Sequence, residues 1–174
     1  MKYTLHLLLV ACMMILFSCS DVQFEKPQPV WISSNESSFP QHLRGNYVSD
    51  KDTFRISEKR IVDNDKKPDF DLNLSDSVYL KKDSNTYFLN IRNERSKTWT
   101  ILMATEKKEK LRVYSLSFDD SKILRKLEKL TTLKVTKDST GKVTNCIINP
   151  SEEEFRKIID QKLFKLTLTL KKIN

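Results

Sequence analysis

The sequence predicts an α+β domain with a mainly antiparallel, strongly bent or partly closed β-sheet and two helices near the C-terminus. Three runs rich in β-branched and aromatic residues, at 85–92, 98–105 and 111–117, are typical of strands. The short polar turns between them, NERSK and EKKEK, favour antiparallel neighbours joined by hairpins. Two segments with the helical spacing of apolar residues follow in the C-terminal third.

Further strands are predicted on both sides of these runs. LRGNYVS and DTFRISEKRIVDN indicate short strands near the start of the domain. LTTLKVTKDSTGKVTNCII predicts a hairpin whose turn contains Gly141, since glycine readily takes the positive φ that such a loop needs. In the last run, FKLTLTLKK, strict alternation predicts that Leu166, Leu168 and Leu170 face a core while their neighbours face water.

The two helices are predicted from their apolar stripes and their caps. In DDSKILRKLEKL, Ile123, Leu124, Leu127 and Leu130 share one face, and Asp119, Asp120 or Ser121 can cap the start. The second helix follows Ser151, which stands three residues before Glu154 in a capping-box pattern. Its expected buried stripe is formed by Phe155, Ile158 and Ile159.

The stretch LVACMMILFSCSD, from Leu9 to Asp21, places two cysteines within or beside an apolar run over residues 5–17. That run is shorter than the roughly 20 residues that span a bilayer, and its length is typical of a secretory signal. The segment resembles a bacterial lipoprotein signal peptide, in which a short motif with an aliphatic residue precedes an acylated cysteine. The polar residues after it and the Lys-rich, Gly-poor body resemble small lipoproteins of the Bacteroidota.

Both Cys12 and Cys19 are candidates for the acylated residue. Leu9-Val10-Ala11 fits the motif better than Leu16-Phe17-Ser18, because Phe17 is bulkier than usual. Cleavage before Cys12, however, would leave the apolar residues 13–17 on the mature protein, whereas cleavage before Cys19 removes the whole run. We therefore expect lipidation at Cys19.

The resemblance implies three segments and a location. Residues 1–18 are expected to be the signal peptide, residues 19–38 a lipidated flexible tether, and residues 39–174 a single α+β globular domain. The tether is predicted from its serines and prolines, which bury little surface. The resemblance implies a cell-envelope protein held on the membrane by an N-terminal lipid. Ser20 after the cysteine favours the outer membrane over the inner membrane.

Charge and cysteine content limit the partners. Without residues 1–18, the chain has 30 Lys and Arg against 23 Asp and Glu, scattered rather than gathered in one block. Nucleic-acid binding would want a concentrated basic face, so we expect no nucleic-acid partner. Cys146 would be the only other cysteine, so no intramolecular disulfide is expected, and its apolar neighbours predict a buried strand residue.

The usual catalytic patterns are missing or have simpler explanations. Two glycines and two histidines are too few for a phosphate-binding loop or a common zinc site, and His42 has no Gly-x-Ser-x-Gly partner motif. The acidic groups at 119–120 and 152–154 stand where helices should start, so capping explains them. Asp63, Asp65, Asp69 and Asp71 lack the order of an EF-hand calcium loop. We expect no cofactor, no metal and no catalytic residues.

Aromatic residues on adjacent predicted strands are the best functional signal. Some must fill the core, and others could line a ligand cavity on the opposite sheet face. The candidate ligand-binding residues are Tyr79, Tyr87, Trp99 and Tyr114. The leading hypothesis is a non-enzymatic binding or interaction module for a small apolar ligand or an envelope protein. The alternatives are a glycan hydrolase that uses Asp or Glu carboxylates, and an inhibitor or immunity-type protein that binds a secreted enzyme.

Overall fold

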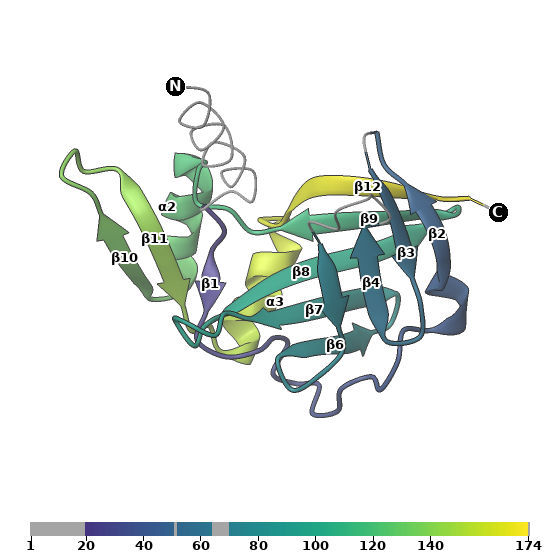
Figure 1. The fold of residues 1–174 in the computed structure, drawn as a ribbon. Coiled ribbons are helices and arrows are strands. Elements are labelled where there is room, and N and C mark those ends of the chain that lie inside the picture. Colours follow the sequence, from purple (N-terminus) through teal and green to yellow (C-terminus); the bar gives the residue numbers. More distant parts are fainter. Residues whose placement is uncertain (1–19, 51, 64–69, 174) are drawn as a thin grey trace, which may run out of the picture.

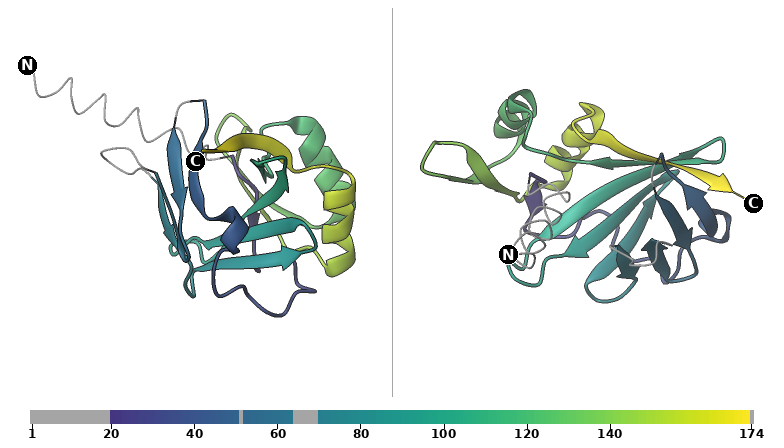
Figure 2. Two further views of the ribbon diagram at one scale, coloured as in Figure 1. Left: turned by 90° about the vertical axis from the view of Figure 1, so that its right-hand side faces the viewer. Right: turned by 45° about the horizontal axis from the view of Figure 1, so that its top comes forward.

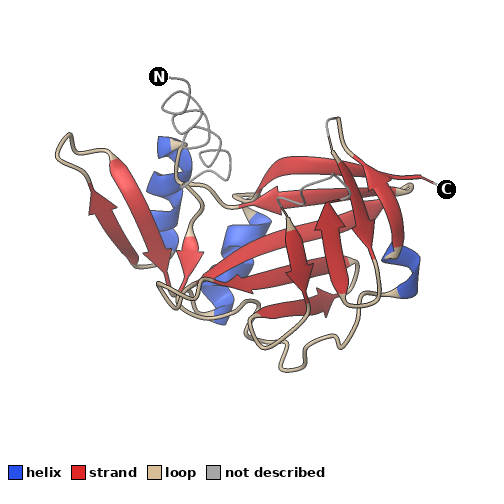
Figure 3. Cartoon of the chain, viewed as in Figure 1, coloured by secondary structure: helices blue, strands red, loops and turns tan. Residues whose placement is uncertain are grey.

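The computed structural model describes residues 20–50, 52–63 and 70–173. Within these ranges the protein is largely β, with twelve strands in one mixed, open sheet and two α-helices (Figures 1 and 3). The expected signal peptide and Cys19 lie outside the described residues. The strands are β1 (Gln23–Phe24), β2 (Gly45–Val48), β3 (Thr53–Ile56), β4 (Arg60–Asp63), β5 (Asp71–Asn73), β6 (Val78–Asp83), β7 (Thr86–Arg92), β8 (Trp99–Lys107), β9 (Lys110–Ser115), β10 (Leu133–Lys137), β11 (Val143–Ile148) and β12 (Lys165–Ile173). The helices are η1 (Gln41–Leu43, a 3₁₀ turn), α2 (Ser121–Leu130) and α3 (Glu152–Asp160).

The sheet divides at the long strand β8. Its last residues pair with β9, and the antiparallel path continues through β12, β2, β3 and β4 to β5, while β6 and β7 extend it from the other edge of β8. Its first residues, Trp99 and Thr100, pair instead with β1, which in turn pairs in parallel with β11. This parallel pairing makes the sheet mixed, so the fold is more β-rich and less purely antiparallel than the sequence predicts.

The antiparallel part of the sheet is strongly bent. Strands β2 to β4 fold across β6 to β8, whereas both helices lie together on the other side of the sheet (Figures 1 and 2). Side-chain alternation therefore supplies two cores. Along β8, Leu102 and Ala104 belong to the inner cluster within the bend, and Ile101 and Met103 belong to the outer cluster beneath the helices.

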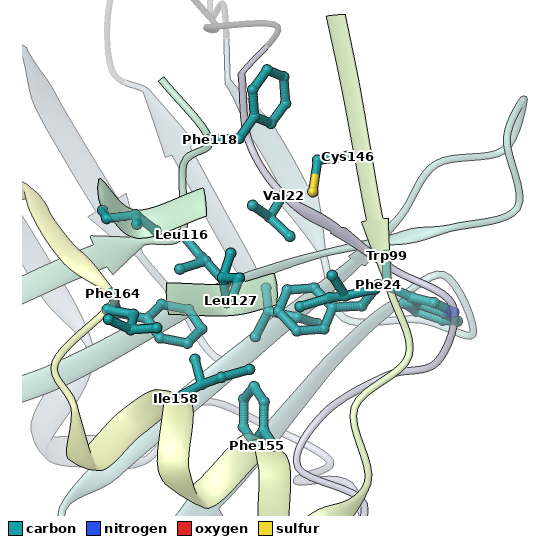
Figure 4. Packing of buried hydrophobic residues seen from close by; sticks show 14 of the residues in the cluster. Val22, Phe24, Trp99, Leu116, Phe118, Leu127, Cys146, Phe155, Ile158 and Phe164 are labelled. Carbon is teal, nitrogen blue, oxygen red and sulfur yellow. The ribbon is translucent and has the colours of Figure 1, made fainter. Parts of the chain in front are cut away.

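The outer cluster is built around Phe155 of α3 (Figure 4). The Phe155 ring is fully buried, with its centroid 5.9 Å from that of Phe24, 6.0 Å from Phe88 and 6.1 Å from Phe164. From α2, Ile123 and Leu127 are buried in the same cluster. The predicted apolar stripes of both helices are thus confirmed.

The caps of the two helices are also confirmed. The Asp120 carboxylate accepts a hydrogen bond from the backbone N–H of Lys122 at 2.8 Å. At α3, the Ser151 hydroxyl accepts from the Glu154 backbone N–H at 3.3 Å, and the Glu154 carboxylate accepts from the Ser151 N–H at 2.7 Å. Short-range sequence patterns suffice here because every partner is within three residues.

The segment expected to be a flexible tether is instead part of the folded body. Val22 is 1% exposed and Phe24 is fully buried, and the Val22 backbone N–H donates to the Leu116 carbonyl at 2.7 Å. β1 occupies the position beside the start of β8 that β9 leaves vacant. The prediction of a tether over residues 19–38 is therefore wrong for the described residues, because two apolar side chains at i and i+2 suffice for a short buried strand.

The rest of this segment is fastened by polar contacts. The Asn90 side-chain oxygen accepts a hydrogen bond from the Gln28 backbone N–H at 2.6 Å. The Asn90 side-chain NH₂ donates to the Gln28 backbone carbonyl at 2.8 Å. The buried Lys81 ammonium donates to the carbonyls of Pro29 and Ile32, both at 2.9 Å. Trp31 donates to Asp83 at 3.0 Å. These contacts hold the segment against β6 and β7 as far as Ile32.

Strand β12 departs from the predicted alternation at its start. The pairing with β9 shifts register between Leu166 and Leu168, and Leu166 is 54% exposed. Leu168 and Leu170 face inward as expected. The prediction of a core position was wrong for Leu166, because a bulge adds one residue and reverses the facing of those before it.

Candidate functional site: an apolar cavity inside the bent sheet

The bend of the sheet encloses a cavity of about 610 Å³. This volume falls within the range of about 300–1,000 Å³ that is typical of small-molecule sites. Strands β3, β4, β6, β7, β8, β9 and β12 all contribute to its wall, which is mostly aliphatic and aromatic. The apolar lining residues are Phe39, Leu43, Phe54, Ile56, Ile61, Phe70, Leu80, Tyr87, Leu89, Leu102, Ala104, Leu111, Val113, Leu168 and Leu170.

One end of the cavity is closed by the segment around η1. Phe39 and Leu43 are buried there, and the Tyr47 hydroxyl donates to the Leu43 carbonyl at 2.8 Å. The Lys172 ammonium donates to the carbonyl of His42 at 2.7 Å, which ties the turn to β12. Gly45 starts β2 at φ +142°, a conformation that favours glycine because side chains rarely adopt it.

Among the described residues that line the cavity, Tyr87 is the one tyrosine, and its hydroxyl lies at this closed end. The hydroxyl lies 3.0 Å from His42 Nε2, which is itself 3.5 Å from a Glu106 carboxylate oxygen. Burial raises the pKa of Tyr87, and the negative charges of Glu106 and Glu36 raise it further. The hydroxyl is therefore neutral at physiological pH and serves as a hydrogen-bonding group.

The other end of the cavity is polar. Its lining residues are Ser20, Asp21, Ser115, Ser117, Asp119 and Thr167. Hydrogen bonds place Ser20 and Asp21 beside the end of β9. The Ser20 carbonyl accepts from the Phe118 N–H at 2.9 Å and from the Ser117 hydroxyl at 3.1 Å. Asp21 forms an isolated antiparallel β-bridge with Ser117. Asp119 and Thr167 are exposed whereas Leu43 and Leu89 are buried, so the cavity opens at this polar end.

Asp21 is the less exposed carboxylate of the pair at the opening. Burial raises its pKa, a hydrogen bond with the Ser115 side chain lowers it, and the negative charge of Asp119 raises it again. The net shift is upward. Among the described residues, neither Asp21 nor Asp119 forms an ion pair with a basic side chain.

The four aromatic residues predicted to bind a ligand are not brought together. Tyr87 lines the cavity, whereas Tyr79, Trp99 and Tyr114 pack on the outer cluster. The rings of Tyr79 and Trp99 stack with centroids 5.0 Å apart, and the Arg92 guanidinium lies 5.8 Å from the Trp99 centroid. Residue type alone does not separate the two faces of the sheet.

Most of the lining residues were not singled out from the sequence. The signal that could have found them is the phase of the alternation in each strand. Leu102 and Ala104 alternate with Ile101 and Met103 along β8. Once the face of one of these residues is known, the faces of the others follow. The sequence contains that pattern, but the bend that makes one face a cavity depends on long-range pairing.

Other candidate groups have local partners. Asp120 and Glu154 are helix caps, while Glu152 pairs with Arg156 at 3.0 Å and Glu153 with Lys157 at 2.6 Å. Asp65 and Asp69 lie outside the described residues, and in the described ranges no three His, Cys, Asp or Glu side chains converge as a metal site. Cys146 is fully buried in β11, and burial raises the pKa of its thiol to about 11.

Searches against protein-family models, curated proteins and solved structures found no match to this chain. In the described part of the chain, no helix is long and apolar enough to cross a membrane. The cavity is consequently the feature from which a function can be inferred.

Proposed function

We propose that this protein is a lipid-anchored, non-enzymatic binding module of the cell envelope that takes a small apolar ligand into the cavity of its bent sheet. The single observation that carries this proposal is the cavity itself. Its 610 Å³ are walled by aliphatic and aromatic side chains from seven strands, closed at the η1 end and open at the polar end. The finer fold description, an α+β domain on a partly closed sheet, is part of the same proposal.

A binding role is favoured because an unfilled apolar cavity is costly. Interiors are close-packed, and an empty space forfeits the contacts that its lining would make. Apolar cavities exclude water and accept apolar molecules instead. A cavity of this size therefore favours a ligand as its occupant rather than solvent.

The location of the carboxylates gives less support to a glycan hydrolase. Asp120 and Glu154 cap helices, and Glu152 and Glu153 form ion pairs with residues four positions on. Asp21 and Asp119 do line the cavity, but the wall beyond their end of it is almost entirely apolar and offers few hydrogen-bonding groups to a sugar. An apolar ligand matches this wall better than a glycan does.

The anchor is proposed at Cys19 from the sequence. Because Cys19 is bonded to Ser20, and Ser20 lines the cavity, the lipid would be attached within one residue of the opening. Mass spectrometry of protein expressed in a lipoprotein-processing bacterium tests the site. Cys19→Ala should abolish acylation and Cys12→Ala should not. Acylated Cys19→Ala protein would refute the assignment.

Ligand binding can be tested with the uncharged fluorophore N-phenyl-1-naphthylamine, titrated into the full chain carrying Cys19→Ala. We expect saturable fluorescence enhancement. Ala104→Trp should fill the cavity and reduce binding by at least about tenfold, since the larger side chain excludes the probe. Thr105→Trp is the matched control, because Thr105 is the next residue of β8 and does not line the cavity. Absence of binding, or equal losses in both variants, would overturn the proposed function.

A further inference from the structure

We propose that the ligand carries a cationic amine head group, held between Asp21 and Asp119 at the open end while its apolar body fills the cavity. This inference deepens the proposed function and depends on it. It is drawn from the distribution of polar groups along the cavity, which is uneven in both position and charge.

The polar lining is confined to one end. Besides the two carboxylates it consists of the hydroxyl side chains of Ser20, Ser115, Ser117 and Thr167. Everything else on the wall is apolar, apart from the Tyr87 hydroxyl at the closed end. A molecule that fills the cavity must therefore place an apolar part inside and any polar part at the opening. This is the geometry for an amphipathic ligand.

Both charged side chains that line the open end are carboxylates, and no ion pair within the described ranges compensates Asp21 or Asp119. Among the described residues, no Lys, Arg or His side chain lines the cavity. A carboxylate or phosphate head group would face two carboxylates without a counterion. A cation supplies the charge that this end lacks.

The setting of Asp21 adds to this argument. Its carboxylate is partly buried, and burial and Asp119 both disfavour its ionised form. An ammonium group between the two carboxylates would favour the ionised form of Asp21, because a nearby opposite charge stabilises a carboxylate. Ser115 fixes the Asp21 carboxylate by a hydrogen bond, so the acceptor is held before a ligand arrives.

Three probes with the same alkyl chain test the head group. Dodecylamine, dodecanol and dodecanoate are used below their micellar concentrations, near neutral pH, to displace the naphthylamine fluorophore from the full chain carrying Cys19→Ala. We expect dodecylamine to bind at least about tenfold more tightly than dodecanol, since hydrogen bonds that involve charged groups are stronger than hydrogen bonds between neutral groups. Dodecanoate should bind more weakly than both.

Two variants locate the effect. Asp21→Asn and Asp119→Asn should each weaken dodecylamine binding by about tenfold and leave dodecanol and the fluorophore unchanged. Asp76→Asn is the control, because Asp76 is an exposed carboxylate that does not line the cavity. Both substitutions preserve shape, and unchanged fluorophore affinity reports that the cavity remains intact.

The outcomes separate the two proposals. Equal affinity for the amine and dodecanoate, or an amine preference that survives both Asp variants, would overturn the head-group inference while the binding function stands. If the wild-type cavity binds no probe at all, the proposed function fails and this inference fails with it. A preference lost in Asp21→Asn and Asp119→Asn but kept in Asp76→Asn establishes both.

Discussion

At the residue scale, Asp21 combines a role in the cavity with a cost in stability. Because burial raises its folded-state pKa above the unfolded value of 3.8, its contribution to stability is fully present below pH 3.8 and is lost as pH rises through the folded pKa. Its ionised form is thus unfavourable to the fold at neutral pH. A group kept against stability is typical of functional sites.

Asp21→Asn should consequently raise the free energy of unfolding at neutral pH. The advantage over the wild type should shrink as pH falls, and should be lost below pH 3.8, where the wild-type carboxyl is itself protonated in both states. Urea unfolding of both proteins at several pH values measures the difference. A variant that is less stable than wild type at neutral pH, or an advantage that grows on acidification, would contradict the expectation.

Gly45 is the residue whose backbone conformation is most demanding. Its φ of +142° lies in a region that is essentially reserved for glycine, so Gly45→Ala should lower the free energy of unfolding by about 1–3 kcal/mol. An added Cβ would also approach Lys172 Cε to 2.8 Å, but that flexible side chain can move. Chemical denaturation checks the loss, with Asn46→Ala as the exposed neighbouring control. Full rescue by Lys172→Ala would show that contact, not backbone strain, is the cause.

At the scale of elements, β1 shows how two residues can complete a sheet. Phe24 is fully buried and its ring meets Phe155 edge-on at 5.9 Å. Phe24→Ala should lower the free energy of unfolding by about 3–5 kcal/mol, because it leaves a cavity in the outer cluster. Val30→Ala, at a position 41% exposed in the same segment, should change it by no more than about 0.5 kcal/mol. Equal effects would indicate that β1 is not part of the cooperative fold.

Elements with local signals could be predicted from the sequence and β1 could not. The capping box of Ser151 and Glu154 spans three residues, and the apolar stripes of α2 and α3 repeat within ten. Gln23 and Phe24, in contrast, pair with residues at 99–100 and 147–148. Nothing in the surrounding serines and prolines indicates partners so far along the chain. The exposed Leu166 was missed for a related reason, since a bulge is defined by two strands together.

At the scale of the whole molecule, the cavity depends on the order in which strands pair. Alternation predicted two-faced strands, but not that β2 to β4 would fold over β6 to β8. Three of the four candidate ligand-binding aromatics lie on the outer cluster, while aliphatic residues such as Leu102 and Leu168 line the cavity. Which face becomes the cavity is decided by curvature, and curvature is a property of the assembled sheet.

Ligand binding should stabilise the whole sheet, because the unfolded chain has no cavity. At a free ligand concentration of 100 times Kd, the free energy of unfolding should rise by about 2.7 kcal/mol. Thermal or urea unfolding with and without dodecylamine measures this gain. At the same ligand concentration Ala104→Trp should gain no more than about 1.4 kcal/mol, because its affinity is expected to be at least about tenfold lower. Stabilisation of equal size in Ala104→Trp would place the binding site elsewhere.

The place of β1 in the sheet also constrains the order of folding. β1 is the first strand of the described chain, but its neighbour β11 ends at Ile148. During synthesis from the N-terminus, Val22 and Phe24 therefore remain without their partners in β11 until most of the chain has emerged. The outer cluster can close only after that delay. Because Thr167, Leu168 and Leu170 of β12 line the cavity, the ligand site is likewise among the last parts of the molecule to be completed.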